Sequence, residues 1–329
     1  MIRFRVEPED FKVEEIPLYP PTGEGSHTFV RVLKRLRTSD AIARQLAVVA
    51  GVPARDIGYA GRKDRVAVTT QWMSVPGLDP EAALSLELDG AEIIEAVKHP
   101  HKLRTGQLRG NVFELLLRDV DPVSEELARE RLAEIEIVGM PNRYGTQRFG
   151  HAGRNPDKGR SILSGEVTLR DRRKARFLVS ALQSQVFNQV LEERPLPLDT
   201  VEEGDVARVT ESGGLFLVED VEVEAERASR FEISATGPIF GTKMQAPSGP
   251  VAEREARIME EFGVPIGPAL CPPRGLRVPG ARRPFRVKVG EPVLSREGDH
   301  LRFCFALPSG SYATVLLEEL FGALGEGRG

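Results

Sequence analysis

At 329 residues the chain is about twice the usual length of one domain, so two compact units or one large unit are expected. Its composition, 40% hydrophobic and 29% charged, is typical of a globular protein and excludes an intrinsically disordered one. The formal net charge of −4 at pH 7 excludes a protein coated in positive charge. No apolar stretch is long enough to span a bilayer and the first residues do not resemble a signal peptide, so we expect a cytoplasmic protein with no membrane partner.

Alternating apolar residues predict short strands in the first part of the chain. A helix is expected from Ser39 or Asp40, either of which can cap it, to Val49, and a second over Pro122–Val138. Strands interleaved with helices indicate an α/β or α+β sheet domain. The strand candidates are Ile2–Val6, Phe11–Val13, His27–Leu33, Ile57–Ala60, Val68–Val75, Glu92–Lys98 and Asn111–Arg118.

The pattern changes after Gly150, where a long helix is predicted over Asp171–Glu193. An acidic stretch follows, which we interpret as short strands joined by a turn at Gly213-Gly214. We therefore divide the chain into a sheet domain over residues 1–138, an insert over residues 139–284 and a tail over residues 285–329 that completes the first domain. The remaining elements are a linker or return path over Gly263–Pro284, strands over Phe285–Val289 and Leu301–Leu307, and a helix over Ser311–Phe321.

Positive charge is concentrated in two segments that contain no acid, Lys98–Gly110 and Arg274–Lys288. Basic loops on an acidic body suit a protein that binds a polyanion at one face, but ordinary solvated surface explains them equally well. In the first segment His99 and His101 flank a proline, which favours phosphate contact over metal ligation. The two cysteines stand in no metal-binding pattern, so we expect no metal site.

The densest group of reactive side chains lies in Gly58–Arg65, which reads Gly-Tyr-Ala-Gly-Arg-Lys-Asp-Arg. Three cations surround Asp64, and nearby positive charge favours the ionised carboxylate. Such an aspartate suits a nucleophile or an electrostatic stabiliser, whereas the alternative is a solvated ion pair at a glycine turn. The segment matches neither a P-loop nor a dinucleotide-binding G-x-G-x-x-G pattern.

Two further segments combine cations with rings and amides. Gly139–Gly150 interleaves arginines with Tyr144 and Phe149, as base stacking and phosphate binding require, although the rings could equally pack within a loop. Leu103–Phe113 places two arginines around a glycine turn, before an amide and a ring. The acids Glu14, Glu15 and Glu24 could supply a carboxylate pair, but nothing in their sequence setting distinguishes them from surface residues.

Taken together, these segments resemble the TruD family of tRNA pseudouridine synthases nearly end to end. The resemblance implies a catalytic domain with a mixed, largely antiparallel sheet and a family-specific inserted α/β domain. It also implies an isomerase that converts uridine to pseudouridine at position thirteen of tRNA, with no cofactor and no obligatory protein partner. The matching motifs are Pro8–Phe11, Gly23–His27, Gly58–Arg65 with Gln71-Trp72, Leu103–Phe113, Asn142–Gly150, Ala181–Asn188 and Leu307–Thr314.

By this resemblance Asp64 matches the catalytic aspartate, acting as a nucleophile or a base. Phe113 matches the ring that stacks on the target base, and Arg5 a basic residue near the aspartate that is often lysine. Phe11, Asn111 and Tyr312 match other positions near the target nucleotide, although Tyr312 replaces an expected phenylalanine. The residues expected to contact RNA elsewhere are Arg62, Lys63, Lys102, Arg104, Arg109, Arg143 and Arg148.

Two other functions stay open from the residues alone. One is a non-catalytic RNA-binding protein, against which the intact Asp64 argues. The other is a hydrolase of N-glycosidic bonds that uses Asp64 with Glu14 or Glu24 and would release free uracil.

Overall fold

The computed structural model describes residues 2–326, which form two compact units. Within the described residues, unit 1 comprises the chain up to Ala133, then Val289–Ala313, then the stretch from Leu317 onward. Unit 2 comprises Glu134–Lys288 together with Thr314–Leu316. The chain therefore passes from unit 1 to unit 2 after Ala133 and returns at Val289.

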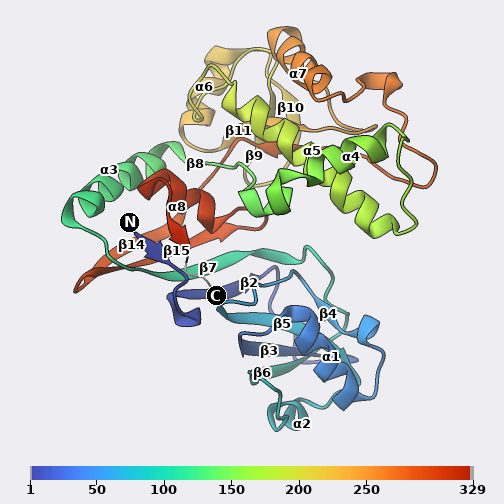
Figure 1. The fold of residues 1–329 in the computed structure, drawn as a ribbon, viewed down its shortest axis with the longest axis vertical. Helices are drawn as coiled ribbons and strands as arrows, with labels where there is room; N and C mark the ends of the chain where they lie inside the picture. The colour runs from blue at the N-terminus through green and yellow to red at the C-terminus, as the bar shows by residue number, and fades with distance from the viewer. Residues whose placement is uncertain (1, 327–329) are drawn as a thin grey trace. The chain divides into compact units, whose positions relative to one another are not determined.

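Unit 1 is built on one large sheet with the strand order β14-β15-β7-β2-β5-β3-β6, and β4 pairs with β5 (Figure 1). Within this sheet β2 and β5 run parallel, whereas the other described pairs are antiparallel. The predicted mixed, largely antiparallel sheet is confirmed. Its strands are β2 (Phe11–Pro17), β3 (His27–Arg35), β4 (Gly58–Tyr59), β5 (Val68–Pro76), β6 (Ala91–His99), β7 (Leu108–Leu117), β14 (Gly290–Glu297) and β15 (His300–Pro308).

The helix α1 (Ser39–Ala50) covers part of this sheet beside β5 (Figure 1). Its buried face, which includes Ile42 and Leu46, packs on valines and Met73 of β3 and β5. The expected cap at Ser39 or Asp40 is wrong, because the hydroxyl of Thr38 accepts the hydrogen bond from the amide of Ala41. The other elements of unit 1 are β1 (Arg3–Phe4) paired with β16 (Gly325–Glu326), and α2 (Pro80–Leu84). Two helices, α3 (Pro122–Val138) and α8 (Ala313–Phe321), contribute residues to both units.

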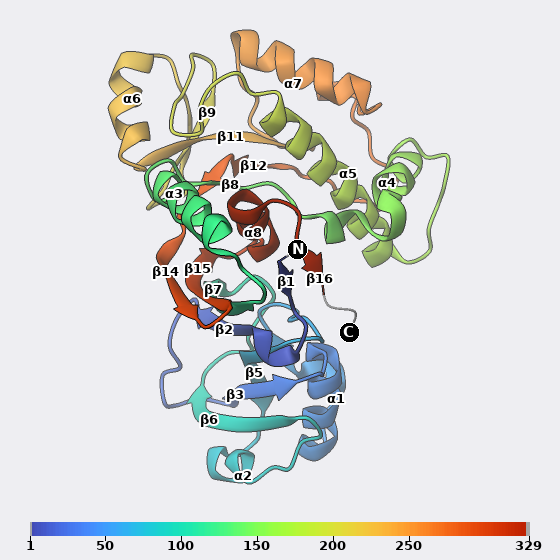
Figure 2. The same cartoon turned by 60° about the vertical axis from the view of Figure 1, so that its left-hand side comes forward.

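Unit 2 has its own core, centred on the long helix α5 (Arg172–Glu192), which packs against β11 (Figure 2). Asp171 caps this helix by accepting hydrogen bonds from two backbone amides of its first turn. The unit contains a four-stranded sheet of order β10-β9-β11-β12 and the pair β13-β8. These strands are β8 (Met140–Pro141), β9 (Val206–Val209), β10 (Leu215–Leu217), β11 (Ile233–Ile239), β12 (Ala281–Pro284) and β13 (Arg286–Val287), and the further helices are α4 (Asn155–Leu163), α6 (Val221–Ser229) and α7 (Gly249–Glu261).

None of the helices within residues 2–326 is both long enough and apolar enough to cross a membrane.

Candidate active site

The loop between β4 and β5 presents Asp64 at the surface of unit 1, with 51% of its side chain exposed. Its Oδ2 accepts a hydrogen bond from Nη2 of Arg5 at 2.9 Å. Arg5 follows β1 in the left-handed backbone region, with a φ of 56°, which is uncommon for a residue with a side chain. Its guanidinium lies 3.8 Å from the centre of the Phe11 ring. The carboxylate is thus held by one anchored cation while half of it stays accessible to a ligand.

Lys34 holds the main chain of the same loop from inside the protein. Its ammonium donates hydrogen bonds to the carbonyl oxygens of Asp64, at 3.0 Å, and of Arg37, at 2.7 Å. The residue is only 1% exposed, and this burial lowers the pKa of its side chain from 10.5 to about 8. The charge of Asp64 opposes the decrease in pKa and that of Lys63 adds to it. Lys34 therefore joins the end of β3 to the backbone of Asp64.

Replacing Lys34 by methionine is expected to flatten the pH dependence of stability. Between pH 8 and 10.5 the unfolded chain retains the Lys34 proton and the native protein does not, so the free energy of unfolding rises with pH. This rise amounts to about 3 kcal/mol over the window and is absent without the amine. Urea unfolding of both proteins at several pH values measures the difference. The control Lys243→Met, which replaces an exposed lysine, should keep the slope of the unmodified protein; equal slopes in the Lys34 variant and the unmodified protein would contradict the assignment.

Lys63, next to Asp64, points inward and connects three elements. Its Nζ lies 2.8 Å from Oε2 of Glu15 on β2 and donates to Oδ1 of Asn111 on β7, also at 2.8 Å. The side chains of Lys63 and Glu15 are 6% and 1% exposed. Burial raises the pKa of Glu15, and the charge of Lys63 opposes that increase. This arrangement argues against the predicted RNA contact of Lys63, and it corrects the view of Glu15 as a surface acid.

Ser39, the first residue of α1, fixes the backbone of the same loop. Its hydroxyl donates to the amide oxygen of Gln71 at 2.6 Å and accepts from the backbone N–H of Lys63 at 3.0 Å. The side chain that was expected to cap α1 is thus used to position the residue before Asp64.

Three phenylalanine rings form the floor beside Arg5. Phe11 and Phe113 meet edge to face with centroids 6.1 Å apart, and Phe305 of β15 stacks on Phe113 at 5.2 Å. Phe11 is 2% exposed, so in this conformation its ring supports the guanidinium of Arg5 and is not open to a base. The sequence prediction did not include Phe305, although alternation along Leu301, Phe303 and Phe305 places it on the buried face of β15.

The structure therefore brings Arg5, Phe11, Asp64, Asn111 and Phe113 together in unit 1 through the contacts described above. Tyr312 is half-buried and immediately precedes α8. Its predicted place beside the target nucleotide stays a prediction.

The predicted RNA contacts of unit 1 occupy different settings. Arg62 is 78% exposed and lies 3.2 Å from the carboxylate of Asp40. The ammonium of Lys102 donates to the carbonyl oxygen of Arg55, whereas the side chains of Arg104 and Arg109 are exposed. The expectation that His99 contacts phosphate is corrected, because its ring is buried between the rings of Tyr19 and Phe29.

In unit 2 the loop after β8 is attached to α5. The backbone of Tyr144 exchanges two hydrogen bonds with the amide of Asn188, and the guanidinium of Arg148 donates to the hydroxyls of Ser180 and Ser184. Arg143 is half-buried in the same loop. Both arginines are thus positioned by a folded loop, and their contact with RNA stays a prediction.

The basic segment Arg274–Lys288 is only partly a surface. Arg282 is buried against Glu255, with Nη2 and Oε1 2.7 Å apart, and this burial raises the pKa of Glu255. Arg286 is buried as well and donates to backbone carbonyl groups, including that of Val138 at 2.7 Å. These two cations stabilise the core of unit 2, while Arg274 and Arg277 remain exposed.

Comparison with known proteins agrees with this fold. The family model described as tRNA pseudouridine synthase D (TruD) matches residues 1–170 and 168–320. The tRNA pseudouridine synthase D of Anaeromyxobacter dehalogenans is 43% identical over 95% of this chain and 90% of its own length. That of Geobacter sulfurreducens is 37% identical over 98% of this chain and 95% of its own, and that of Thermus thermophilus 43% over 96% and 87%.

A crystal structure from Methanosarcina mazei, described as a TruD, superposes with a TM-score of 0.79 at 23% identity, covering 98% of this chain and 93% of that one. The fold and the matches define an enzyme of the tRNA pseudouridine synthase class, which is a class of isomerases. Within that class the chain belongs to the tRNA pseudouridine synthase D (TruD) family.

Proposed function

We propose that the protein isomerises uridine to pseudouridine at position thirteen of tRNA, with Asp64 as the catalytic carboxylate. The observation that carries the proposal is the half-exposed Asp64 side chain, anchored by Arg5 and held at its backbone by Lys34. Family membership supports the reaction, and the resemblance in the sequence motifs supports the position on the tRNA.

The reaction breaks the bond between N1 of uracil and C1′ of the ribose and forms a bond between C5 and C1′. N1 gains a proton and C5 loses one, so nothing is released. Asp64 serves as a nucleophile at C1′ or at C6, or as the base that removes the C2′ proton; all three routes require the ionised carboxylate. Arg5 orients the carboxylate by donating a hydrogen bond to Oδ2 at 2.9 Å.

The target base has to leave its helical stack to reach this carboxylate. Asn111 lies at the start of β7, with Lys63 fixing its amide oxygen, so the amide nitrogen remains to donate to a uracil oxygen or the ribose. Phe113, two residues further along the same strand, is buried between Phe11 and Phe305, so in this conformation its ring supports the site from beneath.

The proposal is tested by incubating the protein with unmodified tRNA and locating pseudouridine by carbodiimide treatment and reverse transcription. The expected result is one stop, at position thirteen, with no free uracil. Release of uracil would indicate the hydrolase, and tight tRNA binding with neither product would indicate the non-catalytic binding protein. A single stop at another uridine would overturn the position and retain the reaction.

A further inference from the structure

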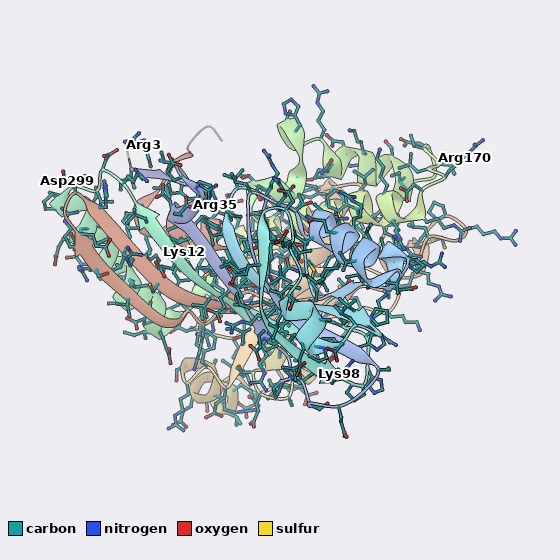
Figure 3. The ribbon with its side chains drawn as sticks, turned by 90° about the horizontal axis from the view of Figure 1, so that it is seen from below. Arg3, Lys12, Arg35, Lys98, Arg170 and Asp299 are labelled. Carbon is teal, nitrogen blue, oxygen red and sulfur yellow. The ribbon has the colours of Figure 1, made fainter. Side chains whose placement is uncertain are left out.

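A strongly basic surface of unit 2 has no role in the site described above. Residues 166–176, at and before the start of α5, carry five cations and two acids, and the facing loop adds two cations. All seven cationic side chains are exposed. Figure 3 shows one of them, Arg170, pointing away from the ribbon. They are Arg170, Arg172, Arg173, Lys174, Arg176, Arg274 and Arg277.

Within residues 2–326 none of these seven cations forms an ion pair with a carboxylate. Asp171 lies among them, but its carboxylate accepts hydrogen bonds from the backbone amides of Arg173 and Lys174. By contrast, three arginines of α6 and α7 or of the residue after α6 pair with acids one helical turn away, as Arg227 does with Glu224 at 2.7 Å. Like charges that remain unpaired repel one another, so this surface is suited to an anion from outside the chain.

The same surface contains a recess of about 280 Å³. Arginines 170, 172 and 274 line it together with apolar side chains that include Leu169 and Leu276. Gly275, with a φ of 85°, brings the loop so close to α5 that a Cβ atom there would lie 2.7 Å from the guanidinium carbon of Arg172. The guanidinium of Arg172 thus lies directly against the loop, and the positive φ of Gly275 is a conformation that favours glycine.

We propose that this arginine recess binds a nucleotide of the tRNA other than the target uridine. Guanidinium groups bind phosphate oxygens in a bidentate manner and stack on bases, and the apolar lining accepts the face of an unpaired base. The recess thus adds a contact between the tRNA and unit 2. The identity of its ligand rests on the proposed function.

The decisive variant is Arg170→Gln/Arg172→Gln/Arg274→Gln, tested for binding of unmodified tRNA over a range of salt concentrations. We expect binding to weaken about 10- to 100-fold at moderate salt, with a smaller dependence on salt because fewer counterions are released. In turnover, KM should rise and kcat should stay the same, because none of the residues assigned to the reaction lines the recess. The matched control is Arg227→Gln/Arg230→Gln/Arg257→Gln, which removes the same charge from arginines that are already paired with acids, and should bind as the unmodified protein does.

A third variant, with lysine at the same three recess positions, separates a shaped site from diffuse attraction. Lysine keeps the charge and loses the planar fork, so weaker binding than that of the unmodified protein supports the recess. Full binding by the lysine variant, or unchanged affinity and salt dependence in the glutamine variant, would overturn it. Binding is measured apart from catalysis. If the unmodified protein binds tRNA more tightly than the glutamine variant but forms no pseudouridine, the proposed function is wrong and the proposal for the recess stands. Failure of the unmodified protein to bind tRNA would remove both.

Discussion

Asp64→Asn is expected to lower the rate of pseudouridine formation by at least about 10³-fold, because the amide can act neither as a nucleophile nor as a base. Tight tRNA binding should persist, since asparagine keeps the size of the side chain and its acceptor oxygen. The protein should also stay folded, because the side chain at this position is half exposed and asparagine still offers Arg5 an acceptor oxygen. Single-turnover assays with carbodiimide detection measure the rate, and filter binding measures the tRNA complex.

Asp119→Asn provides the matched control. Asp119 also lies in unit 1, is 47% exposed and pairs with one arginine, Arg3, at 2.7 Å. Its φ of 59° is a conformation that asparagine adopts readily, so the substitution adds no strain. This variant should match the unmodified protein in rate. Equal pseudouridine yield from the Asp64 variant would show that another group carries the reaction.

Local patterns in the sequence predicted most of the sheet. Each strand buries one face, so apolar residues recur at every second position. The helix expected over Pro122–Val138 has those bounds in the structure, and the turn at Gly213-Gly214 joins the antiparallel strands β9 and β10. The acidic stretch misled the prediction at α6, where Val221 and Val223 alternate with glutamates as in a strand. Asp220 nevertheless starts a helix there by capping two amides. The prediction did not include α2, α4, α7 or β14.

The contacts of the site depend on long-range geometry that spacing does not contain. Arg5 and Asp64 are 59 residues apart, and only the resemblance to a family indicated their proximity. A local signal did exist for the buried charges: Glu15 continues the buried face of Phe11 and Val13, and Lys34 that of Val30 and Val32. A charge at such a position must be paired or bonded to the main chain, since burial otherwise disfavours it.

Lys63→Met is expected to destabilise the protein by about 3–5 kcal/mol near neutral pH, because it leaves the carboxylate of Glu15 buried without its counter-ion. The pKa of Glu15 is already raised by burial, so the native protein takes up a proton there at a higher pH than the unfolded chain does. The associated stability decreases as the pH rises through this window. Removing Lys63 raises the pKa of Glu15 further, because the charge of Lys63 opposes the increase. The loss of stability should therefore be larger at pH 8 than at pH 5. Chemical unfolding at both values measures it.

The double variant Glu15→Gln/Lys63→Met separates the contribution of this pair to folding from its effect on the site. Removing both charges should restore much of the stability, because no ion is then buried. The rate should remain about 10²-fold low, since Asn111 has lost the ammonium that fixes its amide and a displacement of about 1 Å is enough for such a loss. The control for lowered stability is Leu46→Ala, which creates a cavity beneath α1 away from these contacts. It should retain the rate per folded molecule. If the double variant recovered both stability and rate, the role of Lys63 would be only to neutralise Glu15. Lys63 would then not be needed to position Asn111 or Asp64 for the reaction.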